Sequence, residues 1–228
     1  MTDSARGAAL GALLAALAGA GPAAADPALG APTVTRFWLA GPDGPAPACT
    51  GTYVRDAGAV WLVTVRHCAG PGVWHAGRAA PERRLAVIDP AGAPAARHGD
   101  LALLGDVAAG PAPHGHAALA PAARAPRAGT VWVHGFPYGI EHVTAARVLG
   151  DSAARPGLLE LRIVVGPQTE AGPGFSGAPV IDQTGRLVGL LAALRADDAR
   201  ALTAFVVPVE SLRAALARLA PALGGLPR

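Results

Sequence analysis

The stretch that narrows the fold most is Gly172-Pro173-Gly174-Phe175-Ser176-Gly177-Ala178-Pro179-Val180. Glycines on both sides of Ser176 let the backbone turn tightly and bring its N–H groups beside the serine hydroxyl. That geometry suits the binding of a developing oxyanion. Beyond residue 25 the sequence has two other serines, Ser152 and Ser211, so this placement favours a nucleophile. The alternative is a glycine-rich hairpin that carries an incidental serine.

Two further motifs supply the partners that a nucleophilic serine needs. An apolar run from Val60 to Val65 leads to His67, so a rigid strand would hold an imidazole at the edge of a cleft, as a general base requires. Asp100 precedes the apolar run 101–104, where a buried carboxylate can bond to the imidazole. Alone, this Asp is more typical of a turn residue that caps a strand.

The order of these residues separates the classes of serine hydrolase. All seven histidines precede Ser176, which excludes the order Ser, acid, His of the α/β-hydrolases. Subtilisin order needs an Asp well before the His, and only Asp43 and Asp56 lie between residues 27 and 66. The remaining order, His67, Asp100, Ser176, is the one that chymotrypsin uses.

Short apolar runs separated by Gly, Pro or Asp predict strands joined by turns. The 30 Gly and 22 Pro argue against a helical bundle. Between residues 108 and 129 the composition shifts to Ala, Pro, Gly and Arg, which marks a linker between two small β-barrels or sandwiches. A helix is expected over Ser211–Ala220, with Pro221 as its stop. The predicted strands are 36–39, 52–54, 60–65, 85–88, 101–104, 130–133, 142–149, 158–165, 178–181, 187–191 and 203–207.

The N-terminus predicts export. Arg6, an apolar run from Ala8 to Ala20 and Ala23-Ala24-Ala25 are typical of a secretory signal peptide over residues 1–25. The alternative is a disordered Ala-rich tail. The run is shorter than a membrane span of roughly 20 residues, so we expect a secreted or periplasmic protein with no membrane association after cleavage. Export would permit a disulfide between the two cysteines, Cys49 and Cys68, with two separate buried thiols as the alternative.

Charge and histidine spacing exclude several partners. The basic residues are all Arg, with no run longer than Arg83-Arg84, and the net charge is +3, so neither nucleic acid nor a membrane surface is expected. His98, His114 and His116 could form a metal site. No acid or cysteine lies at ligand spacing, which favours exposed linker residues instead. We therefore expect no metal, no organic cofactor and a monomer.

Jointly, the motifs resemble those of the chymotrypsin-like serine peptidases. The segment 64–68, Thr-Val-Arg-His-Cys, is similar to the family's Thr-Ala-Ala-His-Cys, and 100–104 to its Asp-x-Ala-Leu-Leu. Residues 174–180 resemble Gly-Asp-Ser-Gly-Gly-Pro-Val, and 49–52, Cys-Thr-Gly-Thr, resemble Cys-Gly-Gly-Thr. The likeness covers residues 33–215. The compact spacing resembles small bacterial members, including the protease domain of the Deg-type periplasmic enzymes, more than it resembles the digestive trypsins.

The resemblance implies an all-β fold of two packed six-stranded antiparallel barrels, residues 33–115 and 128–220, with a short C-terminal helix. It implies a serine endopeptidase that cuts polypeptides through His67, Asp100 and Ser176, with the N–H groups of Gly174 and Ser176 as the oxyanion hole. Phe175 replaces the Asp that pairs with a newly cut N-terminus in trypsins, so that activation is not available. A catalytically inert binding module on the same fold is the alternative.

The expected specificity rests on three residues of a substrate pocket. Glu170 lies six residues before Ser176, where trypsins place the Asp that recognises basic P1 side chains. Residues 190–194 resemble the strand that walls the pocket, which includes Ala192, and Leu194 stands at the mouth where open-pocket members have Gly. A branched side chain there would shorten the pocket and cover an acid beneath it. The sequence therefore predicts small aliphatic P1 residues such as Ala or Val.

Overall fold

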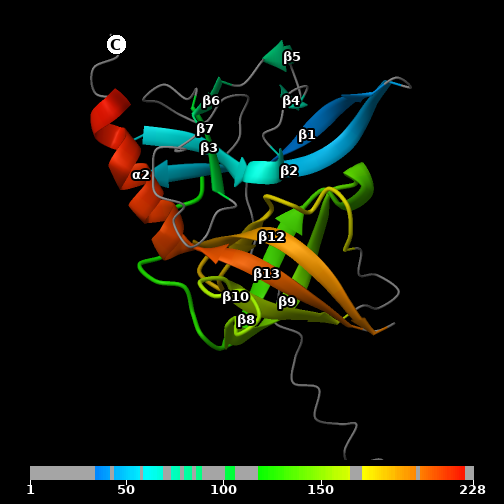
Figure 1. The fold of residues 1–228 in the computed structure, drawn as a ribbon, viewed down its shortest axis with the longest axis vertical. Coiled ribbons are helices and arrows are strands. Elements are labelled where there is room, and N and C mark those ends of the chain that lie inside the picture. Colours follow the sequence, from blue (N-terminus) through cyan, green and yellow to red (C-terminus); the bar gives the residue numbers. More distant parts are fainter. Residues whose placement is uncertain are drawn as a thin grey trace, which may run out of the picture.

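The computed structural model describes residues 34–41, 44–56, 59–68, 73–77, 80–83, 86–88, 101–105, 118–164, 171–198 and 201–223. Their strands form two antiparallel systems, one above the other, with a helix along one side (Figure 1). The predicted signal peptide, residues 1–25, lies outside these residues. No helix in the described part of the chain is both long and apolar enough to span a membrane.

The first half is an antiparallel sheet of seven strands in the order β5-β4-β1-β2-β3-β7-β6. Five of the strands match predicted apolar runs, while β4 and β5 were not expected. Pairing of the two end strands, which would close the predicted six-stranded barrel, is not found in the described residues. The strands are β1 (Val34–Gly41), β2 (Gly44–Asp56), β3 (Ala59–Val65), β4 (Val73–Gly77), β5 (Ala80–Arg83), β6 (Ala86–Ile88) and β7 (Leu101–Gly105).

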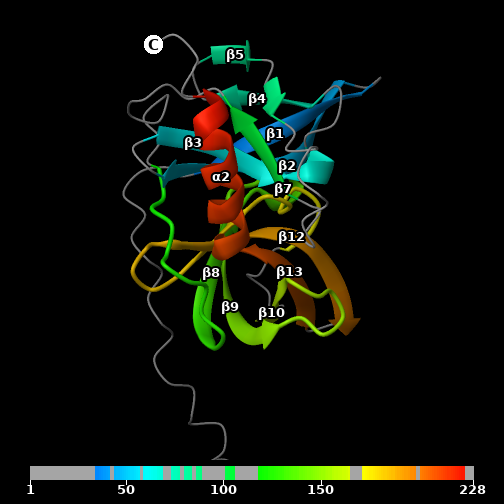
Figure 2. The ribbon, with the colours of Figure 1, turned by 60° about the vertical axis from the view of Figure 1, so that its left-hand side comes forward.

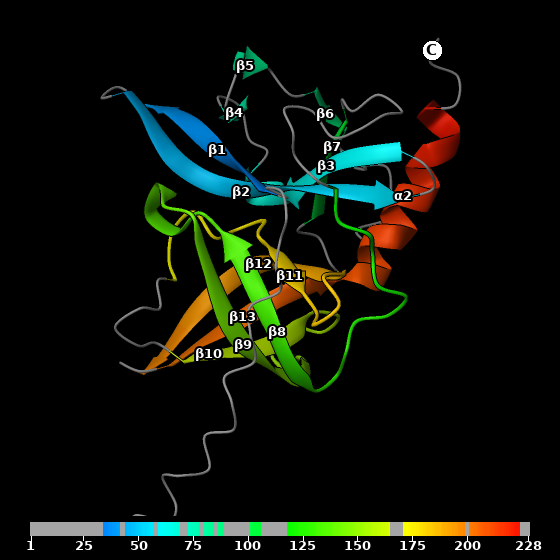
Figure 3. The same cartoon turned by 180° about the vertical axis from the view of Figure 1, so that it is seen from behind.

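The second half is a closed antiparallel barrel of six strands in the order β10-β13-β12-β11-β8-β9, as predicted (Figure 3). Side chains alternate along the strands, so Leu159, Leu161 and Ile163 point into the barrel and are fully buried. The fold class expected from the sequence is confirmed. The strands are β8 (Gly129–Gly135), β9 (His142–Asp151), β10 (Leu159–Val164), β11 (Pro179–Ile181), β12 (Leu187–Asp198) and β13 (Ala201–Pro208).

The helix α2 (Val209–Leu223) follows β13 directly and runs up beside the first sheet (Figure 2). Leu212 and Leu216 lie one turn apart and are buried in the same core cluster as Leu62 of the first sheet. The helix starts before the predicted Ser211 because Val209 is buried in the core of the barrel. It also continues through Pro221, which was expected to end it.

Part of the predicted linker is bonded to both halves. We call residues 118–122 the strap. The N–H of Leu119 donates to the Tyr53 carbonyl of β2 at 2.8 Å, and the Leu119 carbonyl accepts from Arg55 at 2.9 Å. On the other side, the N–H of Leu187 of β12 donates to the Ala120 carbonyl at 3.0 Å. The strap therefore holds the two halves together and is not a slack connection.

Candidate active site

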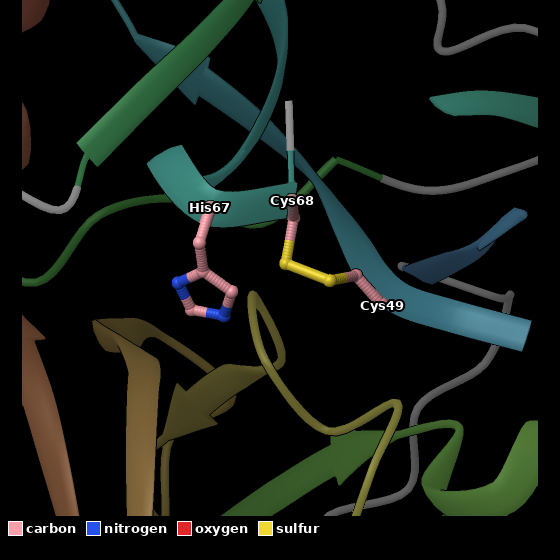
Figure 4. Close-up of side chains that lie close together, drawn as sticks. All are labelled: Cys49, His67 and Cys68. Carbon is pink, nitrogen blue, oxygen red and sulfur yellow. A yellow bond between two sulfur atoms is a disulfide. The ribbon is translucent and has the colours of Figure 1, made fainter. Parts of the chain in front are cut away.

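His67 lies on η1 (Arg66–Cys68), a single 3₁₀ turn that follows β3. Its side chain is exposed, whereas Cys68 is buried and forms a disulfide with Cys49 of β2. The predicted disulfide is thus confirmed, and the alternative of two separate thiols is excluded. Figure 4 shows the imidazole beside the disulfide, which runs from the turn to Cys49 on β2. The disulfide ties the turn that carries His67 to β2.

A ring nitrogen of His67 and the two sulfur atoms lie within 4.8 Å of one another. Such a trio of ligands would suit a metal only if both cysteines were thiolates. Here the sulfurs are bonded to each other, so the group offers an imidazole alone. The other histidines considered as ligands, His98, His114 and His116, lie outside the described residues.

Ser176 lies in a loop that precedes β11, which we call the serine loop (residues 171–178). Ser176 is half-buried, and its neighbour Phe175 is fully buried in the core of the barrel. Gly174 and Gly177 have φ angles of 100° and 85°, in the left-handed region that favours glycine. A Cβ on Gly177 would strike the Thr50 carbonyl oxygen, so this position needs glycine for space as well as for conformation.

Donors of the first sheet hold the serine loop. The N–H of Thr50 donates to the Ser176 carbonyl at 2.8 Å, and the Thr52 hydroxyl donates to the Gly177 carbonyl at 2.9 Å. The Thr64 hydroxyl donates to the Thr50 carbonyl at 2.8 Å. All three threonines are fully buried. Our sequence reasoning did not single them out, although Thr50 and Thr52 lie two apart on one face of a strand, which signals a shared role.

The same contacts bring the surroundings of His67 to Ser176. Sγ of Cys68 lies 3.8 Å from the Ser176 carbonyl oxygen. Because a disulfide sulfur has no proton to donate, this is a van der Waals contact. The residue next to the predicted base therefore packs directly on the backbone of the predicted nucleophile. The two come from opposite halves and lie at the seam between them.

Two predicted site residues, Asp100 and Glu170, lie outside the described residues. The position of Leu101, the residue that follows Asp100, is known from the strand register. β7 begins at Leu101, which pairs with Val65 at the end of β3, two residues before His67. The start of β7 is therefore beside the end of the strand that leads to the histidine.

The predicted pocket residues Ala192 and Leu194 follow the part of β12 that bonds to the serine loop. The N–H of Gly177 donates to the Leu191 carbonyl at 2.7 Å, and the N–H of Leu191 donates to the Ala178 carbonyl at 2.8 Å. The register with β13 then shifts between residues 191 and 193, and Ala192 is buried there. Leu194 is half-buried and pairs with Ala204 of β13.

A second turn supports the serine loop from the side of the barrel. It is η3 (Pro137–Gly139), and the N–H of Tyr138 donates to the Pro173 carbonyl at 2.6 Å. Tyr138 has a φ of 53°, and no other non-glycine residue in the described ranges has a positive φ. Such strain in an aromatic residue persists where surrounding contacts impose it, often at functional sites. Arg36 of β1 is one such contact, since its guanidinium donates to the Gly139 carbonyl at 3.1 Å.

His134 lies at the end of β8, just before this turn, and is buried. Its Nε2 lies 3.1 Å from Oε1 of Glu141, which follows the turn. Burial lowers the pKa of His134, and the hydrogen bond and charge of Glu141 oppose that shift in part. Burial therefore favours the neutral imidazole over the charged form, and Nε2–H is the tautomer that can donate to the carboxylate.

Comparison with known families decides the class of protein to which this site belongs. The model of the trypsin-like peptidase domain matches residues 49–190, more than half of the chain. The chain belongs to the trypsin-like peptidase domain family. The matched range contains the disulfide, the His67 turn and the serine loop. The disulfide, His67 and Ser176 therefore lie within a trypsin-like peptidase domain.

Solved structures that share the fold of this peptidase domain include proteases. An inactive mutant of Rv3671c from M. tuberculosis H37Rv has a TM-score of 0.57 and 23% identity, over 90% of this chain and 98% of that one. The serine endoprotease from Yersinia pestis has a TM-score of 0.59 and 17% identity, over 83% of this chain and 63% of that one, so this chain spans less than two thirds of its length. The HtrA-type protease AlgW with a tripeptide gives 0.56 and 17%, over 83% and 60%. At these identities the likeness is one of fold. A comparison with curated protein sequences gave no match.

Proposed function

We propose that the chain is an exported serine endopeptidase that hydrolyses peptide bonds through His67, Asp100 and Ser176. The observation that carries the proposal is the glycine-flanked Ser176, whose backbone packs on the neighbour of His67 at the seam of a trypsin-like peptidase fold. The sequence of residues 1–25 supports export. Polypeptides are the substrate, and the protein acts as a monomer.

The mechanism is acyl transfer in two halves. His67 takes the proton of Ser176 Oγ while that oxygen bonds to the substrate carbonyl carbon, and the N–H groups of Gly174 and Ser176 stabilise the oxyanion. His67 then gives the proton to the leaving amine as the C–N bond breaks. A water molecule hydrolyses the acyl-enzyme by the same proton transfers. Asp100 orients the imidazole and stabilises its protonated form.

Ser176→Ala tests the proposal. The wild-type protein should react covalently with a fluorophosphonate at Ser176 and hydrolyse peptides, and the variant should do neither. Removing one half-buried hydroxyl should change the free energy of unfolding by less than about 1 kcal/mol. Hydrolysis by the variant would contradict the assignment of the nucleophile. A folded wild-type protein that does not label would favour the inert binding module.

The role of His67 predicts a pH dependence of catalysis. The imidazole must be neutral to accept a proton. We therefore expect kcat/KM to rise with pH with an apparent pKa near 7, close to the ordinary histidine pKa of about 6.5. A rate that stays flat between about pH 5 and 8 would argue against a histidine base.

We also propose a preference for small aliphatic P1 residues such as Ala or Val. Leu194 at the mouth of the pocket and the buried Ala192 leave an apolar wall, and an unpaired Glu170 beneath it would be costly to bury. Leu194→Gly should shift the preference in a peptide library towards larger side chains. Dominant cleavage after Arg or Lys would instead favour Glu170 as the specificity residue.

A further inference from the structure

We propose that Thr50 is a positioning residue for the oxyanion hole, because its hydroxyl fixes the peptide groups around Gly174. The inference rests on the proposed function, in which the N–H groups of Gly174 and Ser176 bind the oxyanion. Thr50 lies on β2 of the first sheet, 124 residues before Gly174 in the chain. It would act through these groups without touching the substrate.

Thr50 bonds to both residues that would supply the oxyanion hole. Its N–H donates to the Ser176 carbonyl at 2.8 Å, and its hydroxyl donates to the Gly174 carbonyl at 2.7 Å. The same hydroxyl accepts a hydrogen bond from the N–H of Phe136 at 3.1 Å. Thr50 has no solvent exposure, so these bonds are not exchanged for water in the folded protein. The hydroxyl thus fixes the plane of the peptide group that follows Gly174.

The peptide group that precedes Gly174 is fixed from the other side. The Pro173 carbonyl accepts from the N–H of Tyr138 at 2.6 Å. In a trans peptide the C=O and the N–H point in opposite directions, so this bond turns the N–H of Gly174 away from Tyr138. Phe136 and Tyr138 belong to one turn, and Phe136 is bonded to the Thr50 hydroxyl. Thr50 is therefore the junction of the contacts that hold both peptide groups.

Gly174 is the position at which such support matters most. With no Cβ and a φ of 100°, it can rotate its two peptide groups more freely than any other residue type. A rotation of the preceding peptide would remove one oxyanion donor, and loss of one donor typically lowers kcat by about 10² to 10³. The Thr50 hydroxyl opposes that rotation by fixing the adjacent carbonyl.

The test is a set of matched threonine variants. Thr50→Val keeps the side-chain volume but leaves the Gly174 carbonyl and the Phe136 N–H buried without a partner. We expect kcat to fall by about tenfold or more, while KM changes by less than about threefold in either direction. The pH at which kcat/KM rises should not change. Thr50→Ser restores the hydroxyl and should recover most of kcat. If Thr50→Val does not fold, Thr50→Ala replaces it and is judged by the same split between kcat and KM.

Thr52→Val is the control, because Thr52 is equally buried and its hydroxyl also donates to the serine loop, at the Gly177 carbonyl. This variant should lower kcat much less than Thr50→Val at a similar cost in unfolding free energy. An equal loss of kcat in both variants, or no recovery in Thr50→Ser, would overturn the role of Thr50.

Crystal structures of the wild type and Thr50→Val separate this inference from the proposed function. The carbonyl and the N–H of Gly174 should change direction in the variant. If they do not, Thr50 does not set them, and the inference is wrong whatever the activity. A wild-type protein that fails to label with a fluorophosphonate would refute the proposed function, while the direction of these groups still decides whether Thr50 fixes Gly174.

Discussion

Gly177 lies where the serine loop packs against the first sheet. A Cβ at this position would overlap the Thr50 carbonyl oxygen and the Thr64 hydroxyl, both from the first sheet. Gly185, in the turn between β11 and β12, also has a positive φ, of 76°, but a Cβ there meets nothing within 4 Å. Comparing substitutions at Gly177 and Gly185 therefore separates two contributions to the loss of stability: the strain of a left-handed backbone, and the steric overlap with the first sheet.

Gly177→Ala should therefore destabilise the protein far more than Gly185→Ala. We expect about 3 kcal/mol or more for the first, from overlap added to the left-handed backbone, and about 1 kcal/mol for the second, from the backbone alone. Urea unfolding measures both. Equal losses would show that the halves can move apart at Gly177 at little cost.

Burial lowers the pKa of His134 below its ordinary value of 6.5. The unfolded chain takes up a proton as the pH falls through about 6.5, whereas the folded protein stays neutral to a lower pH. Protons thus favour the unfolded state, and the stability that the neutral histidine contributes is lost as the pH falls from 6.5 towards the folded pKa.

His134→Gln tests this linkage, because Gln keeps an N–H donor for Glu141 and does not titrate. Between about pH 7.5 and 5, the wild type should lose more unfolding free energy than the variant. The other histidines are common to both proteins and cancel in the comparison. Identical losses would mean that His134 takes up its proton equally in the folded and unfolded chains.

At the scale of elements, apolar periodicity predicted most of the fold. Each predicted strand, such as 60–65 within β3, coincides with an observed one. Two strands were missed, β4 (Val73–Gly77) and β5 (Ala80–Arg83). The second of them holds Pro81 and two charged residues and has no apolar alternation of its own. These strands form through the sheet, since β4 pairs with β1 and β5 pairs with β4. Pairing of this kind is tertiary and cannot be seen in a local pattern.

The sequence predicted those site residues whose type and immediate neighbours indicate a catalytic role. It did not predict residues whose role depends on contacts with distant parts of the chain. A serine between glycines and a histidine after a strand carry their own signal. Thr50 does not, because its hydroxyl acts on Gly174, 124 residues away. Tyr138 likewise has an ordinary sequence context, and its φ of 53° is imposed by contacts that only the folded chain provides.

The disulfide connects two elements, β2 and the turn η1, across a sequence separation of 19 residues. Closing a loop of this size should stabilise the protein by about 3 kcal/mol, within a usual range of about 2 to 4. Urea unfolding with and without a reductant measures the effect. The double variant Cys49→Ala/Cys68→Ala should be as unstable as the reduced wild type and insensitive to reductant. A midpoint that reductant does not move in the wild type would contradict the prediction.

At the scale of the whole molecule, one core cluster belongs to both halves. Val54 and Leu62 of the first sheet lie in the same cluster as Phe205 and Val207 of the barrel. Leu216 of α2, which follows the barrel in sequence, is buried in it as well. The first sheet is thus completed by side chains from the C-terminal end of the chain. It shares this cluster with the barrel, which also has a core cluster of its own.

We therefore expect the two halves to unfold in one cooperative transition. Trp61 of β3 and Trp132 of β8 are buried reporters, one in each half. Two variants, each keeping one of them as the sole tryptophan, should give thermal midpoints that agree within about 2 °C of each other after correction for the substitutions. Separate midpoints for the two reporters would show that the halves unfold independently.

The strap bears on how a substrate can arrive. Many two-lobed enzymes admit their ligands by hinge rotation, which needs a slack tether between the lobes. Here the tether is bonded through its backbone to β2 at Leu119 and to β12 at Ala120, so swinging the halves apart would break these bonds first. We therefore expect the two halves to keep one relative position when a substrate binds. A protein substrate should then present its scissile bond in an unfolded segment, a tail or a loose loop.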